Sequence, residues 1–205
     1  MSETEEHWQR IYGTKAAREV SWYEPVATTS LALIEAAGAR PDEPLVDVGA
    51  GASVLVDGLL ERGFSDVTLV DVSQAALETV RARLGEAGRG VRYVATDLLS
   101  WAPERTFALW HDRAVLHFLV DAAARDAYRS VLSAALRPGG AAVIATFADD
   151  GPERCSGLPV RRYSPDELAA ELAPVVRMVD SMRVVHTTPW GAEQRFVYGR
   201  FVRGG

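Results

Sequence analysis

The sequence predicts an α/β fold: a three-layer sandwich in which a mostly parallel sheet of seven strands lies between two layers of helices, with an antiparallel hairpin at the C-terminal end. Short apolar runs alternate with segments of helical spacing, which is typical of parallel strands joined by crossover helices. The last two apolar stretches are instead joined by a short turn. A chain of 205 residues with 48% hydrophobic side chains can form one sizeable core, so we expect a single domain over residues 1–205.

The first half of the chain contains the first repeats of this pattern. Residues 1–27 have no clear period, but residues 28–30 can cap a helix over the apolar run 31–37, which ends at Gly38. Short apolar runs bounded by turn residues predict three strands, at 45–48, 67–70 and 91–95. Apolar residues at helical spacing predict two helices, at 53–62 and 73–84.

The second half repeats the pattern and then departs from it. The same signals predict a strand at 107–110, a helix at 121–136 that is stopped by Pro138-Gly139-Gly140, and a strand at 141–147. Ser164 before Pro165 predicts the N-terminus of a last helix. The stretches 175–185 and 195–202, joined by a turn at 189–191, predict an antiparallel hairpin that closes the sheet.

The composition excludes several classes of function. The net charge is −6 and the pI is about 5.3, so the chain has no overall positive charge with which to bind nucleic acid or an anionic membrane. Cys155 is the only cysteine, which excludes an intramolecular disulfide and a zinc site made of thiolates. There is no apolar targeting segment and no run of about 18 apolar residues. We therefore expect a soluble, cytoplasmic protein.

A glycine-rich turn, VDVGAGAS at residues 46–53, follows the first predicted strand. Gly49 and Gly51 let the backbone approach a ligand, and the helix that follows favours negative charge at its N-terminus. Asp71 ends the second strand twenty residues after Gly51, at the spacing of a ribose-binding acid. Asp97 follows the third strand at the same edge of the sheet. The combination predicts a nucleoside site; the alternative is a tight turn in which Asp71 only caps a helix.

The same loop argues against a dinucleotide ligand. Val54 stands where the dinucleotide fingerprint has its third glycine. Asp47, two residues before Gly49, would repel a phosphate, whereas it suits an ammonium group. These features point to S-adenosylmethionine, because its amino acid end is zwitterionic and its sulfonium is cationic.

The strings VDVGAGAS, LVDVS, ATDLL and LRPGG resemble the nucleotide-binding motifs of class I S-adenosylmethionine-dependent methyltransferases. The resemblance covers residues 45–147 and implies a Rossmann-like fold. It places the methionine end at Asp47, Gly49 and Gly51, the ribose at Asp71 and Val72, and the adenine at Asp97 and Leu98. Ser53 stands where the family often has another glycine, and we expect Ser53 and Trp22 to complete the set of cofactor-binding residues.

Three regions are expected within the domain: an N-terminal helical lid region at 1–40, a cofactor-binding core at 45–147, and a C-terminal part at 148–205 with a substrate loop, the last helix and the terminal hairpin. Four aromatic residues precede the sheet, namely Trp8, Tyr12, Trp22 and Tyr23. Either they fold over the cofactor and face its sulfonium by cation–π attraction, or they pack as ordinary side chains.

The segment WHDRAVLHF, residues 110–118, follows the fourth strand and is therefore expected to face the sulfonium. We expect Arg113 to hold an anionic acceptor and His117 to remove a proton, with Asp112 as a third catalytic residue. The structural alternative is that Asp112 and Arg113 form an ion pair and that His117 belongs to the core. Further acceptor contacts are expected from His111, Cys155 and His186, with Gln194 beside the terminal turn.

The same segment has a looser similarity to thiopurine S-methyltransferase-like enzymes, and only Asp112 and Arg113 carry over from it. The asparagine–proline tetrad that marks many amine methyltransferases is absent. A thiol with a pKa of about 8.5 is already partly ionised at neutral pH. We therefore favour a small-molecule acceptor with a thiol or another soft nucleophile, and we expect no metal, nucleic acid or membrane partner.

Other functions stay open at this point. The protein could methylate a protein lysine or a small-molecule O-acceptor, or it could be a non-catalytic module that binds S-adenosylmethionine and regulates a partner. The presence of the acids Asp47, Asp71 and Asp97 opposes the non-catalytic alternative. A nicotinamide-dependent oxidoreductase uses the same kind of sheet. Lys15 is the only lysine, however, and no tyrosine precedes it by four residues, so we disfavour this class.

Overall fold

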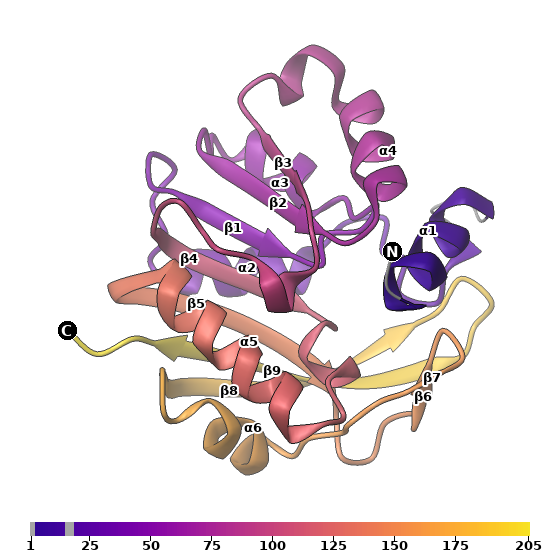
Figure 1. Cartoon of the computed structure of the whole chain (residues 1–205), viewed down its shortest axis with the longest axis vertical. Coiled ribbons are helices and arrows are strands. Elements are labelled where there is room, and N and C mark those ends of the chain that lie inside the picture. The colour runs from indigo at the N-terminus through magenta and orange to yellow at the C-terminus, as the bar shows by residue number, and fades with distance from the viewer. Residues whose placement is uncertain (1–2, 15–18) are drawn as a thin grey trace.

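The structure of the chain is a computed structural model that describes residues 3–14 and 19–205. Its centre is a seven-stranded sheet with the strand order β3-β2-β1-β4-β5-β9-β8 (Figure 1). The first five strands are parallel, and β9 runs antiparallel to both β5 and β8. The strands are β1 Leu45–Val48, β2 Val67–Asp71, β3 Arg92–Ala95, β4 Phe107–Arg113, β5 Leu136–Phe147, β8 Arg177–Thr187 and β9 Glu193–Val202. The predicted fold class is confirmed.

Helices cover both faces of this sheet (Figure 1). The core on one face includes side chains of α2 Thr28–Ala36, α3 Leu55–Glu61 and α4 Gln74–Leu84. The core on the other face includes side chains of α5 Ala122–Ala135 and α6 Pro165–Leu172. The smaller elements are α1 Glu3–Thr14, the 3₁₀ turns η2 Gly85–Gly88, η3 Leu98–Ser100 and η4 Leu116–Phe118, and the short hairpin of β6 Arg154–Cys155 with β7 Leu158–Pro159.

The pleat of the sheet decides which side chains of β1 and β4 lie together. Along a strand, successive side chains point to opposite faces, so Asp47 shares the face of Leu45, and His111 shares the face of Leu109. The register pairs Asp47 directly with His111 on the neighbouring parallel strand. Two polar side chains therefore meet on the face that is covered by α2.

The structure departs from the sequence prediction at three places. Helix α1 lies within the helical lid region expected at 1–40, but the sequence did not indicate its bounds, since its inner side mixes the polar Gln9 with the aromatic Trp8 and Tyr12. Strand β4 continues past residue 110 to Arg113, since its last polar side chains find buried partners. Strand β5 begins at Leu136, before the predicted glycine stop, because Gly139 and Gly140 pair with Arg203.

No helix within residues 3–14 and 19–205 is long and apolar enough to cross a bilayer.

The predicted start of the last helix is confirmed as a capping box. The Ser164 hydroxyl accepts from the Glu167 amide at 3.2 Å, and the Glu167 carboxylate accepts from the Ser164 amide at 2.8 Å. We predict that Ser164→Ala lowers the free energy of unfolding by about 1 kcal/mol, as measured by urea denaturation. The control is Ser130→Ala in the exposed middle of α5, where we expect a change within about 0.5 kcal/mol. Equal effects of the two substitutions would contradict the assignment.

Candidate functional site

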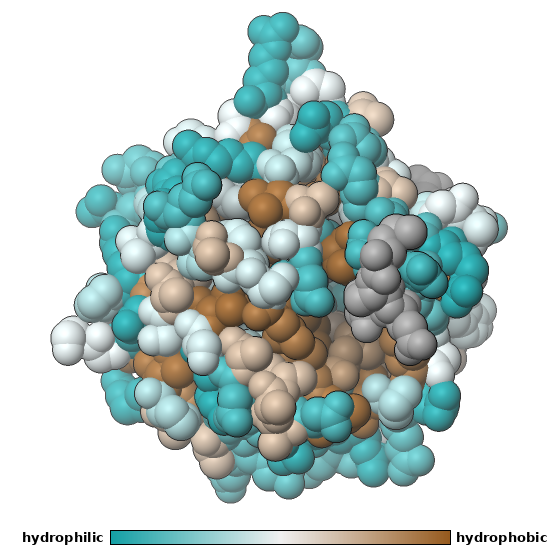
Figure 2. All heavy atoms as spheres, viewed as in Figure 1, coloured by the Kyte–Doolittle hydropathy of each residue, from teal (hydrophilic) through white to brown (hydrophobic). Residues whose placement is uncertain are grey.

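A cavity of about 380 Å³ lies beyond the carboxyl ends of β1, β2 and β4. Its wall is mostly apolar and includes residues of α1, η3, η4 and β9. On the face of the molecule where α1 meets the sheet, apolar side chains surround a hollow (Figure 2). Most residues expected at a ligand line the cavity, namely Trp22, Asp47, Gly49, Ser53, Asp71, Val72, Asp97, Leu98, His111, Arg113, Cys155 and Gln194. Gly51, Asp112, His117 and His186 are outside its lining.

The glycine loop is tightly enclosed by protein. Gly49 and Gly51 both have positive φ, at +62° and +52°, a region that side chains strongly disfavour. A Cβ at Gly49 would collide with the side chain of Val115, and one at Gly51 would collide with the hydroxyl of Tyr12. Both glycines are therefore required by close packing. Ser53, after the loop, accepts from the amide of Leu55, the first residue of α3, at 3.0 Å.

Asp71 ties the glycine loop to the end of β2. One carboxylate oxygen accepts from the Gly51 amide at 2.7 Å, and the other accepts from the Ser73 amide at 2.7 Å. Burial raises the pKa of Asp71 to about 6, although these two amides favour the ionised form. Each oxygen still has capacity to accept a further hydrogen bond from a ligand hydroxyl.

Asp97 holds a turn at the neighbouring end of β3. Its side chain accepts from the Leu99 amide at 2.9 Å and caps η3. This turn places the buried side chain of Leu98 in the cavity wall, together with Val72. The place expected for an adenine ring is therefore apolar, with one carboxylate beside it.

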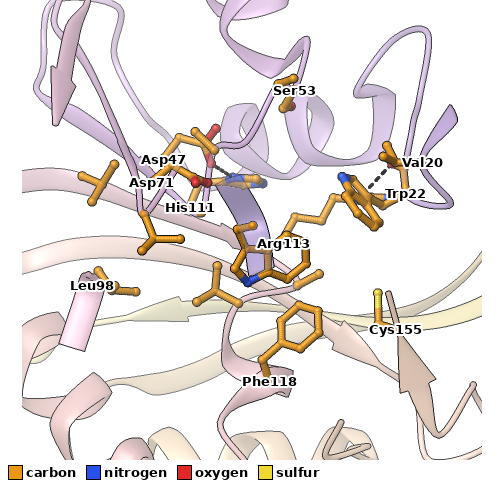
Figure 3. Close-up of a pocket in the computed structure, with 18 of the residues that line it drawn as sticks. Val20, Trp22, Asp47, Ser53, Asp71, Leu98, His111, Arg113, Phe118 and Cys155 are labelled. Atoms are coloured by element: carbon orange, nitrogen blue, oxygen red, sulfur yellow. Dashed lines mark hydrogen bonds and ion pairs between the residues drawn. The ribbon is translucent and has the colours of Figure 1, made fainter. Parts of the chain in front are cut away.

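Asp47 and His111 form a buried pair at the edge of the cavity (Figure 3). The Oδ1 atom of Asp47 lies 2.6 Å from Nδ1 of His111, and Nε2 of the same ring lies 2.9 Å from Oγ of Ser30. The three residues are at most 3% exposed. The sequence indicated Ser30 only as a helix cap and His111 only as an acceptor contact, so their convergence on Asp47 was missed.

Arg113 does not present a free positive charge to the cavity. Its guanidinium donates to Tyr198 Oη at 3.0 Å, to the carbonyl of Trp22 at 3.1 Å and to the carboxylate of Glu24 at 2.9 Å. The guanidinium also lies over the ring of Phe196. The expectation that Arg113 is available to hold an anionic acceptor is therefore corrected: it anchors the segment at 22–24 on the sheet.

Asp112 is a structural acid beneath the cavity, and the expected catalytic role is corrected accordingly. It accepts from Tyr128 Oη at 2.7 Å and from the amides of Val115 and Leu116 at 2.8 and 3.2 Å. Burial raises its pKa to about 6, against these donors. The hydrogen bonds from these two backbone amides fix the turn after β4, where Ala114 has a φ of +79°. They thereby hold Val115 against the glycine loop.

His117 belongs to the core and not to the cavity wall. It is 0% exposed, its Nδ1 accepts from the Phe147 amide at 3.3 Å, and its ring packs against Phe118 and Phe147. Burial, with a smaller effect of the Arg113 charge, lowers its pKa to about 3. A neutral, enclosed imidazole with one nitrogen already bonded does not support the expected removal of a proton from an acceptor.

Four aromatic rings form one wall of the cavity. The ring of Trp8 lies 5.2 Å from that of Phe118 and 5.7 Å from that of Trp22, and the ring of Tyr12 lies 6.3 Å from that of Trp22. Helix α1 is held in this position by Gln9, whose side-chain oxygen accepts from the Ser73 hydroxyl at 3.1 Å. The N-terminal aromatic residues thus line the cavity and also pack against one another.

Of the remaining residues expected to contact the acceptor, two lie in the cavity wall and one lies outside it. Cys155 lies in the wall, but burial raises its pKa to about 12, so the thiol is neutral. Gln194 also lines the cavity. The expectation that His186 contacts the acceptor is corrected, because its Nε2 lies 2.7 Å from the carbonyl of Ser21 and holds the N-terminal segment from outside.

Within the described parts of the chain, no group of three or more His, Cys, Asp or Glu residues is arranged to hold a metal ion.

Residues 45–140 match a family model described as a methyltransferase domain. A curated mouse protein, eEF1A lysine and N-terminal methyltransferase, is 23% identical over 114 residues, which are 54% of this chain. The match spans only 16% of that protein's length.

Two solved structures share the fold over almost the whole chain. A protein of echinomycin biosynthesis, described for the conversion of a disulfide bond into a thioacetal group, has a TM-score of 0.75 at 21% identity and covers 97% of this chain and 92% of its own. The 1,6-didemethyltoxoflavin-N1-methyltransferase of Burkholderia thailandensis, with bound 1,6-didemethyltoxoflavin and S-adenosylhomocysteine, has a TM-score of 0.70 at 26% identity. It covers 95% of this chain and 81% of its own.

The burial of His117 predicts a specific dependence of stability on pH. The unfolded chain takes up a proton at His117 below pH 6.5, whereas the folded chain stays neutral there down to about pH 3, so stability is lost as the pH falls through this window. Relative to His117→Phe, we expect wild type to lose about 2 kcal/mol of unfolding free energy between pH 7 and pH 5. Asp71 and Asp112 are present in both proteins, so their contributions to the pH dependence of stability cancel when the two proteins are compared.

Urea denaturation of both proteins at the two pH values measures the effect. A difference that does not change with pH would mean that the imidazole is protonated freely in the folded chain, which would return His117 to consideration as a proton acceptor.

Proposed function

We propose that this chain, which carries a methyltransferase domain at residues 45–140, transfers the methyl group of S-adenosylmethionine to a small-molecule acceptor. One observation carries the proposal: Asp47, Asp71 and Asp97, from the ends of three neighbouring parallel strands, meet around the glycine loop in the wall of one cavity. In an open parallel sheet, ligands bind at this edge.

The residues present fit this cofactor. Asp47 suits the ammonium group, Asp71 suits the ribose hydroxyls, and the apolar wall around Leu98 suits the adenine. The positive φ values of Gly49 and Gly51 let the loop turn without a side chain in the way. Trp8 and Trp22 offer aromatic faces to a sulfonium cation. The bound S-adenosylhomocysteine of the Burkholderia thailandensis enzyme supports the same assignment.

The cofactor supplies an electrophilic methyl group, and the chain's own residues hold and enclose the acceptor. Helix α1 and the aromatic wall exclude water, which favours a displacement that needs orientation above all. Apart from the acids assigned to the cofactor, the side chains described in the wall offer no free base: Cys155 is a neutral thiol, both ring nitrogens of His111 are engaged, and Glu24 is paired with Arg113. The acceptor must therefore reach the site already deprotonated, with a lone pair available for attack on the methyl group.

This property favours a thiolate or another soft nucleophile on a small molecule. A thiol ionises without help near neutral pH, whereas an alcohol or an ammonium group needs a base. The second candidate is a protein lysine, on the likeness to the mouse lysine methyltransferase. The cover formed by α1 and the aromatic wall leaves a lysine side chain less access than a small molecule.

Binding of the cofactor tests the proposal directly. In isothermal titration calorimetry we expect S-adenosylmethionine and S-adenosylhomocysteine to bind with Kd values on the order of micromolar, and NAD not to bind. Asp71→Asn removes the negative charge of the carboxylate that accepts hydrogen bonds from the ribose hydroxyls, and it should raise both Kd values about tenfold. Asp166→Asn, on the exposed start of α6, is the matched control and should leave them unchanged. Absence of binding of either sulfur nucleoside would end the methyltransferase proposal.

The absence of a protein base in the described wall predicts how methylation rates respond to pH. For a thiol acceptor, kcat/KM should rise tenfold per pH unit up to the pKa of the thiol itself, about 8.5 for an ordinary alkyl thiol, and then level off. An acceptor thiol of lower pKa should shift the midpoint down by the same amount. Initial rates of methyl transfer to two such thiols measure this. A midpoint common to both would reveal a titrating protein group.

A further inference from the structure

We propose that His111, held between Ser30 and Asp47, is a positioning residue that aims Asp47 at the amino acid end of the cofactor. The inference rests on the proposed function, because the ligand at Asp47 is taken to be the ammonium group of S-adenosylmethionine.

The contacts join three elements that are far apart in the sequence. Ser30 Oγ on α2 lies 2.9 Å from Nε2 of His111 on β4. On the other side of the same ring, Nδ1 lies 2.6 Å from Oδ1 of Asp47 on β1. The imidazole of His111 therefore links helix α2 to the acid at the edge of the cavity.

The chemistry of the partners defines the inner contact. A carboxylate accepts, so Nδ1 of His111 donates to Oδ1 of Asp47. On the other side of the ring, Nε2 contacts the hydroxyl of Ser30, a group that can donate or accept. Both ring nitrogens are therefore engaged, and the ring is held between β1 and α2.

Burial makes these contacts restrictive. Asp47, His111 and Ser30 are 3%, 2% and 1% exposed, and a buried polar group without a partner is costly. His111 occupies one oxygen of the Asp47 carboxylate, which fixes the side chain and leaves the other oxygen for a donor in the cavity. The imidazole itself has no free nitrogen with which to contact an acceptor or move a proton.

The cover of the site is held by a second residue of the same strand. Arg113, two residues after His111 on β4, donates to the carbonyl of Trp22 and the carboxylate of Glu24, and Trp22 belongs to the aromatic wall. Strand β4 thus supports both Asp47 and the segment at 22–24. The site therefore selects ligands that carry an amino acid end, and His111 and Ser30 contribute to this selectivity.

The test compares two ligands that differ only beyond the thioether. S-adenosylhomocysteine has the amino acid end, and 5′-methylthioadenosine lacks it. In isothermal titration calorimetry, His111→Phe should raise the Kd of S-adenosylhomocysteine about tenfold and change that of 5′-methylthioadenosine by less than about twofold. His111→Asn keeps an N–H donor for Asp47 and should recover most of the lost affinity. Ser30→Ala should raise the first Kd about threefold.

The matched control is Thr68→Val. Thr68 lies on β2 opposite Val46, is 3% exposed, is not in the cavity wall, and its hydroxyl has no partner within the described residues. It should leave both Kd values unchanged. Thermal unfolding of each variant verifies that it is folded, and should His111→Phe fail to fold, His111→Asn with Ser30→Ala carry the comparison.

Equal losses for the two ligands in His111→Phe or Ser30→Ala would overturn the inference, since they would indicate a purely structural role. An unchanged affinity for S-adenosylhomocysteine would overturn it as well, while leaving the proposed function intact. Failure of wild type to bind any of these nucleosides would instead remove the proposed function and this inference together.

Discussion

The arrangement of the site depends on one buried carboxylate, Asp47, in the middle of a parallel sheet. A charged group in this position is costly unless it is paired, and the register of β1 against β4 places His111 directly beside it. Because His111 in turn binds Ser30, helix α2 is fixed to the same point. The requirement to satisfy one acid thus orients a strand, a helix and one edge of the cavity.

The turn after β4 meets a second constraint of the same kind. Asp112 takes two backbone amides and the hydroxyl of Tyr128, and this holds Ala114 at positive φ and Val115 against Gly49. Buried carboxylates therefore act on both faces of the sheet: one is directed at the cavity and the other supports its floor. The hydrogen-bond partners of these two buried acids thus define both the edge and the floor of the cavity.

Much of this could be predicted from the sequence, because the signals are local. Alternating apolar runs predict the sheet and its helices, and the spacing from Gly51 to Asp71 predicts the edge at which ligands bind. The roles of Arg113 and His117 could not be predicted in this way, since they depend on partners distant in the sequence: Glu24 and Tyr198 neutralise and hold the arginine, and Phe147 encloses the histidine. A helical region was expected at the N-terminus, but the bounds of α1 were not predicted because its inner side is both aromatic and polar.

The proposed function requires that the acids around the glycine loop bind one nucleoside ligand, with its amino acid end at Asp47 and its ribose at Asp71. A crystal structure of the protein with S-adenosylhomocysteine tests it most directly. We expect the ligand in the cavity, with its amino group within hydrogen-bond distance of Asp47 and its ribose hydroxyls at Asp71. The contacts between Asp47, His111 and Ser30 should be unchanged. A ligand bound with its amino acid end away from Asp47, or outside this cavity, would contradict it.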